Sequence, residues 1–379
     1  MKKVHKIVIL LLILGGALGI WYFIAALEEI TFYDTYGYKD GNEWVIPIHL
    51  RVWERGIAQR ALDRSIAHVV SDAERFTGRE INSIDEARVR VRLAAFTADD
   101  ERHQRVTLEF DDDPNGRRYP VRDAGSGDVL SSDSNGRIDG QLRISVDAAN
   151  ELLQRQQSRN GFLTYHAVSR GHTGKGKVRL IPDTPGSLSV ISDIDDTIKI
   201  TEVPAGHRVL FLNTFVREFR SAPGMADRYK QWTDAAFHYV SGGPWQLYQP
   251  QFEFLPEQGF PTGSVHMRNL PLHISNQTNA QQFIDFLFNK QATAVLKKQT
   301  IREIMTHFPS RTFIFVGDSG ECDPEVYREI KDDPTFGDRV QAIFIRVVTD
   351  SKEGRLDGMQ VIDATKVTQA VAGDLACAH

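Results

Sequence analysis

The sequence has few cysteines and no excess of basic charge. Its 379 residues include only two cysteines, Cys322 and Cys377. This excludes a disulfide-rich scaffold and a cysteine-rich zinc site, and leaves one long-range bridge possible. Lys and Arg total 45 against 50 Asp and Glu, so the net charge is -5. A nucleic-acid-binding protein would show a basic footprint, so we expect no nucleic-acid partner.

The N-terminus is a long apolar run, "IVILLLILGGALGIWYFIAA", which covers residues 7–26 without a charge. Twenty apolar residues in a helix just span a bilayer core, so we expect a membrane anchor over residues 1–29. A cleavable signal, cut near Ala17-Leu18-Gly19, is the alternative. The basic start "MKKVHK" would stay in the cytoplasm. We therefore expect a single-pass protein of the inner (plasma) membrane, with its catalytic part on the extracytoplasmic, periplasmic side.

Residues 30–186 have a β-rich composition. The segments "EWVIPIHLRVWE", "RVRLAAFTA" and "RVTLEF" are typical of strands, and "SDSNGR" predicts a hairpin turn at Asn135-Gly136. Residues 57–76 have apolar positions at helical spacing and predict one helix. We expect a mainly β, sandwich-like domain, and no catalytic constellation stands out in it.

Residues 187–379 show a different pattern, in which strands alternate with helices. The predicted strands are "LSVISDID" from Leu188, "FHYVSG" from Phe237, "RTFIFVGDSG" from Arg311 and "VQAIFIRVV" from Val340. Helical segments such as "KKQTIREIMTHF" lie between them. This alternation predicts an α/β domain with a parallel sheet covered on both faces.

Acidic and hydroxyl side chains stand where these strands end. Ligands of such sheets bind beyond the carboxyl ends of the strands, where Asp193, Asp195, Ser241 and Asp318 fall. Clustered carboxylates favour Mg²⁺, which prefers hard oxygen ligands, and metal and phosphate occur together in phosphoryl transfer. An aspartate can attack phosphorus, and a second acid can exchange protons with the leaving group and water. Residues i and i+2 share a face of an extended chain, so Asp193 and Asp195 would enter one cavity while Asp196 turns away.

These residues carry a resemblance to a known family. "DIDDT" (Asp193 to Thr197) matches the D-x-D-x-T motif of the haloacid-dehalogenase-like superfamily, and "GDSGECD" matches its acidic motif. The longer segments "SDIDDTIKIT", "FHYVSGGPWQLY" and "FPSRTFIFVGDSGECDPEVY" resemble the actin-patch-type phosphatidate phosphatase family. The resemblance covers residues 187–348 strongly and the β-rich region faintly. It implies a haloacid-dehalogenase-like catalytic domain.

The resemblance also implies roles for individual residues. Asp193 would be the nucleophile and a Mg²⁺ ligand, and Asp195 the general acid and base, binding Mg²⁺ through its carbonyl. Thr197 would help hold the loop and the acid, and Ser241 and a lysine would hold the phosphoryl oxygens. Asp318 would ligate Mg²⁺, with Asp323 supporting it. The family's lysine position matches Lys297, but the neighbouring Lys298 leaves the choice between them open.

Each of these positions also has a structural interpretation. The acids of 193–196 could cap a helix, and Asp323, before Pro324, could do the same. Ser241 could be a turn serine, and the two lysines a solvated helix end. Glu321 is left unassigned.

The expected activity is Mg²⁺-dependent hydrolysis of phosphatidate to diacylglycerol and phosphate through an aspartyl-phosphate. A phosphatase of a soluble or protein-bound phosphomonoester is the alternative within the same chemistry, and a phosphomutase is another. A catalytically inert, membrane-anchored binding protein is the alternative of a different class. The aromatic segment "GGPWQLYQPQFEFLPEQGFP" is interpreted either as a packed loop or as an apolar wall for acyl chains.

Overall fold

The computed structural model describes residues 28–54, 74–97, 99–168, 174–270, 287–350 and 352–363, together with 67, 70 and 71. The chain divides into two compact units. Unit 1 comprises Met1–Tyr33, Ile46–Leu62 and Ala98–Lys177, and unit 2 comprises Asp34–Val45, Asp63–Thr97 and Val178–His379. The domain boundaries predicted after residues 29 and 186 stay predictions.

Unit 1 is mainly β, as its composition predicted. Strand β1 (Glu28–Phe32) pairs antiparallel with the second half of β3 (Glu43–Glu54), which also pairs with β4 (Asp99–Asp100). Strand β5 (Thr107–Phe110) pairs antiparallel with β6 (Arg118–Pro120) and β8 (Phe162–Ala167). The predicted turn at Asn135-Gly136 precedes β7 (Arg137–Ser145), and Asp133 N donates to Arg137 O at 3.0 Å to close it. The one helix described in this unit is α4 (Val146–Arg155), capped by the Ser145 hydroxyl.

One segment predicted as a strand is a helix. "RVRLAAFTA" lies almost wholly in α3 (Ser83–Thr97), which belongs to unit 2. The Asn82 side chain accepts hydrogen bonds from the backbone N–H groups of Ile84 and Asp85 and so caps the helix start. Val89, Leu93 and Phe96 are fully buried at helical spacing, and this periodicity outweighs the β-rich composition. The helix predicted over 57–76 lies largely outside the described residues.

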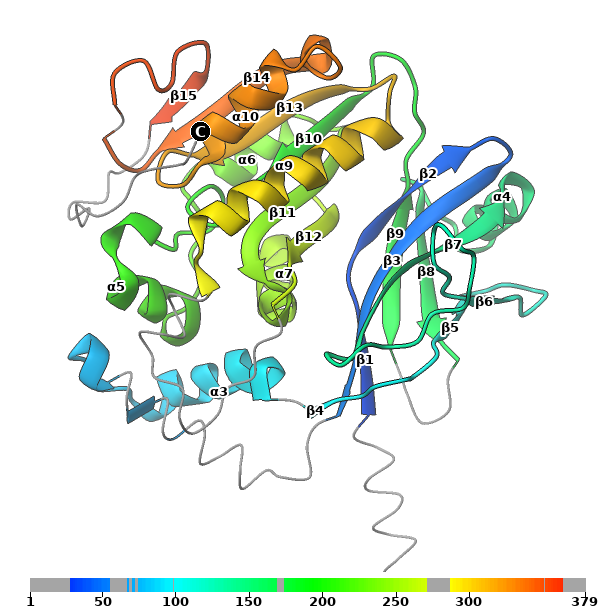
Figure 1. The fold of residues 1–379 in the computed structure, drawn as a ribbon, viewed down its shortest axis with the longest axis horizontal. Helices are drawn as coiled ribbons and strands as arrows, with labels where there is room; N and C mark the ends of the chain where they lie inside the picture. Colours follow the sequence, from blue (N-terminus) through cyan, green and yellow to red (C-terminus); the bar gives the residue numbers. More distant parts are fainter. Residues whose placement is uncertain are drawn as a thin grey trace, which may run out of the picture. The chain divides into compact units, whose positions relative to one another are not determined.

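In the described part of unit 2 one sheet has six strands, and every pairing described in it is parallel. The spatial order is β12 (Ser264–Arg268), β11 (Ala236–Pro244), β10 (Leu188–Ser192), β13 (Thr312–Asp318), β14 (Val340–Val347) and β15 (Gln360–Asp363). Figure 1 shows this sheet from one side. The parallel α/β domain predicted from the sequence is thereby confirmed, and β12 and β15 are two strands that the sequence pattern missed.

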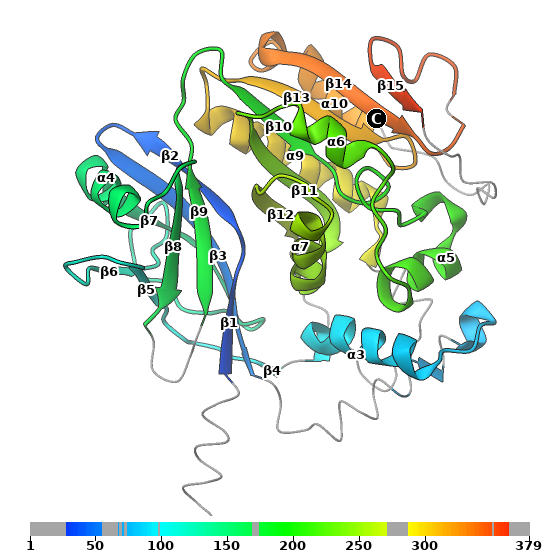
Figure 2. The ribbon, with the colours of Figure 1, turned by 180° about the vertical axis from the view of Figure 1, so that it is seen from behind.

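Helices cover both faces of the sheet. On one face, α9 (Lys290–His307) and α10 (Asp323–Asp332) pack on Ile191, Phe313 and Phe315. On the other face, α6 (Met225–Lys230) and α7 (Tyr248–Glu257) pack on Val190, Ile314 and Val316 (Figure 2). Successive strand residues therefore alternate between two apolar cores, which explains why these strands read as continuous apolar runs. The remaining elements of unit 2 are β2 (Thr35–Asp40), β9 (Lys175–Leu180, which begins in unit 1), η1 (Val203–Ala205), α5 (His207–Phe211), η2 (Leu212–Val216), η3 (Trp245–Leu247) and η4 (Gly337–Arg339).

The predicted membrane anchor requires a correction. Among the helices that the structure describes, none has both the length and the apolar composition that crossing a bilayer demands. The longest, α9, has 18 residues but carries lysines, arginine and glutamate along its length. The N-terminal transmembrane helix and the single-pass inner-membrane location are therefore not supported. The apolar residues 7–26 on which that prediction rested lie outside the described residues.

Candidate active site

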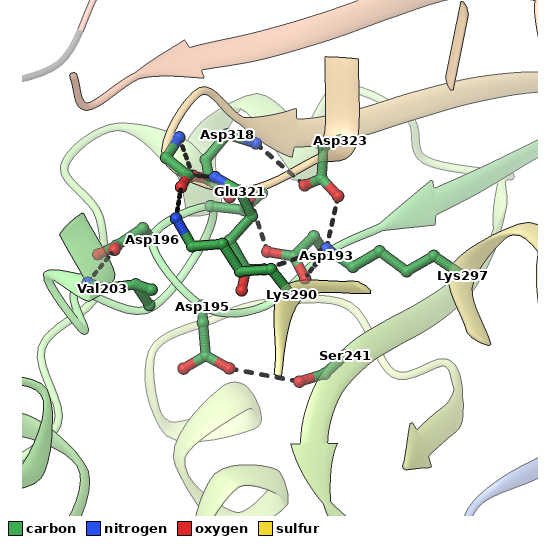
Figure 3. Close-up of polar contacts among 12 residues, drawn as sticks. Asp193, Asp195, Asp196, Val203, Ser241, Lys290, Lys297, Asp318, Glu321 and Asp323 are labelled. Atoms are coloured by element: carbon green, nitrogen blue, oxygen red, sulfur yellow. Dashed lines mark hydrogen bonds and ion pairs between the residues drawn. The ribbon is translucent and has the colours of Figure 1, made fainter. Parts of the chain in front are cut away.

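Three strands of the parallel sheet bring the predicted acids and Ser241 together at the carboxyl end of the sheet (Figure 3). Asp193 directly follows β10, Ser241 lies near the end of β11, and Asp318 is the last residue of β13. The backbone N–H of Asp193 donates to Val316 O at 2.9 Å, so strand pairing continues as far as the first acid. All three side chains are fully buried. The convergence predicted from the sequence is present.

Asp193, Asp318 and Asp323 form an acidic cluster. Each offers one carboxylate oxygen, and these three oxygens lie within 4.8 Å of one another. The Oδ1 atom of Asp318 accepts hydrogen bonds from the N–H groups of Gly320 and Glu321. Its Oδ2 atom is buried without a hydrogen-bond partner in the described part of the chain, whereas the buried Oδ1 of Asp193 is met by the Lys297 ammonium at 2.8 Å. Buried carboxylate oxygens without donors are costly unless a cation meets them.

Lys297 is the cation nearest to these acids among the described residues. It lies on α9 and is 1% exposed. Its Nζ atom is 2.8 Å from Asp193 Oδ1, 2.5 Å from Asp323 Oδ1 and 3.3 Å from Glu321 Oε2. One ammonium thus faces three carboxylates, so the pocket keeps an excess of negative charge.

Lys298, the other candidate, points elsewhere. Its ammonium pairs with Glu329 on α10, and its side chain is 29% exposed. Neighbouring residues of a helix project about 100° apart, so only one of the pair can face the sheet edge. The geometry therefore brings Lys297 to the acids and not Lys298.

Asp195 lies beside Ser241 and Thr201. Its Oδ2 atom accepts a hydrogen bond from Ser241 Oγ at 3.3 Å, and its Oδ1 atom accepts one from Thr201 Oγ1 at 2.7 Å. Thr197 Oγ1 instead donates to Asp193 Oδ2 at 3.0 Å. Ser241 Oγ also accepts the N–H of Gly243 at 3.0 Å. Ser241 thus lies within β11, accepts a local backbone N–H as a turn serine would, and also contacts the second acid.

Asp196 turns away, as predicted, and has a structural role. Its carboxylate accepts the backbone N–H groups of Thr201, Glu202 and Val203 at 2.9, 2.6 and 2.6 Å. Its backbone has φ of 57°, in the left-handed region, where the chain reverses after Asp195. Arg346 Nη1 donates to Asp196 O at 2.6 Å and holds this reversal from β14.

Asp323 is the first residue of α10, and its N-cap is Cys322. Its side chain does not cap the helix. It accepts the Asp318 N–H at 3.2 Å and the Lys297 ammonium. A Cβ atom at Gly317 would lie 2.4 Å from the Asp323 carboxylate, so glycine is required there. Cys322 is disulfide-bonded, and the second cysteine of the chain, Cys377, lies outside the described residues.

Burial and charge shift the pKa values of these groups in opposite directions. Burial, together with neighbouring carboxylates, raises the pKa of Asp193 and of Asp318 well above the usual range, although Lys297 opposes it at Asp193. At Asp195, burial acts in the same direction, but the Lys199 ammonium and the Thr201 hydroxyl outweigh it and lower the pKa. For Lys297, burial would lower the pKa, but Asp193, Asp323 and Glu321 raise it well above the usual value.

Residue-level reasoning from the sequence missed two polar side chains at this edge, Lys199 and Arg346, and left Glu321 unassigned. Lys199 was inside a quoted motif but received no role, and its Nζ lies 2.8 Å from Asp195 Oδ1. Glu321 contacts Lys297, and Arg346 holds the loop at Asp196. Lys199 lies four residues after Asp195, a spacing that could have pointed to it.

The aromatic segment after Ser241 is not a loop. It forms η3 and α7, and Trp245, Leu247, Phe254 and Leu255 are buried. These side chains pack inward. The acyl-chain wall considered for this segment gains no support from their burial.

The comparisons with known proteins agree with the motifs. Residues 188–347 match the family described as "Phosphatidate phosphatase APP1, catalytic domain". Phosphatidate phosphatase APP1 of Saccharomyces cerevisiae is 32% identical over 173 residues, covering 44% of this chain and 27% of that protein. An uncharacterized protein of Schizosaccharomyces pombe is 26% identical over 209 residues, covering 52% of this chain and 32% of that protein. The chain thus spans about a third or less of the length of these curated relatives.

The comparison with solved structures does not help to assign the fold. A β-glucuronidase from Ruminococcus gnavus aligns over 84% of this chain and 43% of its own, with a TM-score of 0.23 and 10% identity. That likeness is too weak to indicate a shared fold. The family match, by contrast, coincides with the segment that contains Asp193, Ser241, Lys297 and Asp318. The resemblance indicated by the motifs is confirmed over residues 188–347, which match the catalytic domain of the phosphatidate phosphatase APP1 family.

Proposed function

We propose that this protein is a metal-dependent phosphatidate phosphatase that works through an aspartyl-phosphate. The observation that carries the proposal is the cluster of Asp193, Asp318 and Asp323 beside Lys297, at the carboxyl edge of a parallel sheet. The family match of residues 188–347 supports the reaction class and the substrate. The yeast relative is named for phosphatidate.

The acidic cluster fits a Mg²⁺ ion. The carboxylate oxygens of Asp193 and Asp318 are hard donors, and Oδ2 of Asp318 has no hydrogen-bond partner among the described residues. The raised pKa of both acids falls when a cation stabilises their charge. Asp193, Asp318 and the carbonyl of Asp195 would hold the ion, with Asp323 supporting the site. When bound, Mg²⁺ would neutralise the charge that develops on the transferred phosphoryl group.

Asp193 and Asp195 have different roles in the reaction. A carboxylate oxygen of Asp193 attacks phosphorus and the ester P–O bond breaks. Asp195, which must carry a proton at this step although Lys199 and Thr201 lower its pKa in the free protein, gives that proton to the leaving alkoxide. In the second step Asp195 removes a proton from water as the water oxygen attacks phosphorus. The bond between phosphorus and Asp193 then breaks, phosphate leaves, and both acids return to their starting states.

The other residues bind and orient. Lys297 and Ser241 would contact the phosphoryl oxygens, because both lie against the reacting acids. Thr197 keeps Asp193 aimed through its 3.0 Å hydrogen bond. Burial of all these groups excludes water, which strengthens each electrostatic contact.

The test is phosphate release by the purified full-length chain. The substrates are dioctanoyl phosphatidate in mixed micelles and para-nitrophenyl phosphate, each with Mg²⁺ and with EDTA. We expect metal-dependent release from phosphatidate, and a loss of at least about 1,000-fold in Asp193→Asn with the fold retained. Lys230→Met, at an exposed ion pair with Asp227, is the matched control and should behave as wild type.

Other results would point to other functions. Release from the aryl ester but not from phosphatidate would favour a phosphatase of soluble or protein-bound esters. An inactive but folded protein would favour a binding module. A bisphosphate product, detected by mass spectrometry, would indicate a phosphomutase.

A further inference from the structure

Lys199 follows the catalytic motif and folds back onto it. The N–H groups of Ile198 and Lys199 both donate to Ile194 O at 3.0 Å, and the Asp196 N–H donates to Lys199 O at 2.7 Å. This tight loop places Lys199 beside Asp195 in a short parallel bridge. The Lys199 side chain is 1% exposed, and its Nζ lies 2.8 Å from Asp195 Oδ1.

The surroundings of Lys199 direct its charge at Asp195. Its ammonium lies 4.7 Å from the centre of the Phe219 ring, an apolar and weakly attractive neighbour. Within the described part of the chain no other group hydrogen-bonds this nitrogen. Burying an ammonium for a single carboxylate contact is expensive, and an apolar side chain of similar volume would fill the space at less cost. The lysine therefore has a use beyond packing.

The two oxygens of Asp195 are treated differently. Oδ1 is held twice, by Lys199 Nζ at 2.8 Å and by Thr201 Oγ1 at 2.7 Å. Oδ2 has one longer contact, from Ser241 Oγ at 3.3 Å. Ser241 lies near the carboxyl end of β11, the strand next to β10, at the end of the sheet where a phosphoryl group would bind. The less restrained oxygen therefore faces the reaction centre, and the restrained one faces away from it.

We propose that Lys199, with Thr201, is a positioning residue that fixes Oδ1 of Asp195 so that Oδ2 is the atom that exchanges the proton. The inference rests on the proposed phosphatase function. Proton transfer requires the donor within hydrogen-bond reach of the leaving oxygen, and a carboxylate free to rotate would spend little time there. Lys199 contacts Asp195 and not the substrate.

Substrates with different leaving groups distinguish a positioning role of Lys199 from a purely structural one. An alkoxide from a lipid phosphomonoester is a strong base and needs a proton to depart, whereas para-nitrophenolate is a weak base and departs without one. The parameter kcat/KM reports only the steps up to release of the first product, so a later hydrolysis step does not obscure the comparison. Misplacement of the proton donor therefore lowers kcat/KM for the alkyl ester more than for the aryl ester.

The experiment compares Lys199→Met, Lys199→Arg and wild type in the full chain, on dioctanoyl phosphatidate and para-nitrophenyl phosphate with Mg²⁺. We expect Lys199→Met to lower kcat/KM by about 100-fold for phosphatidate and by only about tenfold for the aryl ester. Lys199→Arg keeps the charge and should recover much of the loss on phosphatidate. The double variant Asp195→Asn/Lys199→Met should have nearly the same kcat/KM for phosphatidate as Asp195→Asn alone, because both substitutions act through one proton donor.

Each alternative result has a definite meaning. Equal losses on both esters, in a folded Lys199→Met protein, would overturn the positioning role while leaving the phosphatase proposal intact. Wild-type inactivity on both esters would overturn both proposals. If Lys199→Met does not fold, Thr201→Val removes the second contact to the same oxygen and should show the same selective loss. Equal losses in Thr201→Val would then count against the inference.

Discussion

The Nζ atom of Lys297 lies 2.8 Å from Oδ1 of Asp193 and 2.5 Å from Oδ1 of Asp323. One buried ammonium therefore joins the acid that follows β10 to the acid that begins α10. Glu321 is a third carboxylate in reach of this ammonium, and Asp318 adds a fourth acid to the cluster. The arrangement keeps the carboxylates together while leaving negative charge for a further cation.

Replacing Lys297 should cost both activity and stability, because Lys297→Met leaves three buried carboxylates without their ammonium. Breaking a buried ion pair costs about 3–5 kcal/mol of unfolding free energy. The matched variant is Lys298→Met, whose exposed pair with Glu329 contributes about 1 kcal/mol or less. Urea unfolding and phosphate release measure both variants. Similar losses in the two lysine variants would show that the choice of Lys297 is wrong.

The neighbouring acids Asp195 and Asp196 should fail in different ways. Asp196→Asn weakens the acceptor of three backbone N–H groups, so we expect a loss of about 1–3 kcal/mol in unfolding free energy. Asp195→Asn leaves the buried Lys199 ammonium without its carboxylate, so it too should lower the unfolding free energy, but the folded protein should lose at least about 100-fold in kcat/KM for phosphatidate. Thermal unfolding and phosphate release distinguish the two. An Asp195→Asn protein with wild-type activity would exclude this acid as the proton donor.

Gly242, directly after Ser241, packs closely against α9. A Cβ atom there would lie 2.3 Å from the Thr293 hydroxyl and 2.5 Å from its methyl group. Gly242→Ala should therefore destabilise the protein by about 1–3 kcal/mol through overpacking. Thr293→Ala removes both of these atoms, so the double variant should be more stable than the sum of the single effects predicts. Strict additivity in urea unfolding would contradict this account of the contact.

Acidification should destabilise the protein partly through His307. Burial lowers the pKa of His307 to about 4, and its Nδ1 lies 2.8 Å from the Tyr36 hydroxyl. In the unfolded chain the pKa of a histidine is about 6.5. At pH values between the folded and unfolded pKa, the unfolded chain therefore binds a proton that the folded chain does not. Stability from this group is therefore complete above about pH 6.5 and falls as pH decreases toward 4.

His307→Gln removes the titrating ring and keeps a side chain that can accept from Tyr36. The urea midpoint should fall less between pH 7.5 and 5 in this variant than in wild type. Each protein is compared with itself at the two pH values, so a constant effect of the substitution cancels. Parallel decreases in the two proteins would remove His307 from the explanation.

Local pattern was enough to predict the parallel sheet and most of its strands. Apolar runs such as that of Phe313 to Val316 are buried on both faces, and only a parallel sheet between helices produces them in series. Pattern was misleading at residues 90–98. Their β-rich composition predicted a strand, but the periodic burial of Val89, Leu93 and Phe96 makes a helix. The predicted N-terminal membrane helix was not supported by any helix in the described residues.

Residue order is enough to predict which residue types reach the site, because the ends of the strands place Asp193, Ser241 and Asp318 together and the motifs resemble a known family. The choice between equivalent neighbours follows only from the folded chain. Lys297 and Lys298 are adjacent in sequence, but helix rotation lets only one reach the acids. The tight loop after Asp195 likewise brings Lys199 onto one oxygen of that carboxylate. Such choices depend on the direction of side chains in a packed fold, and residue order does not specify that direction.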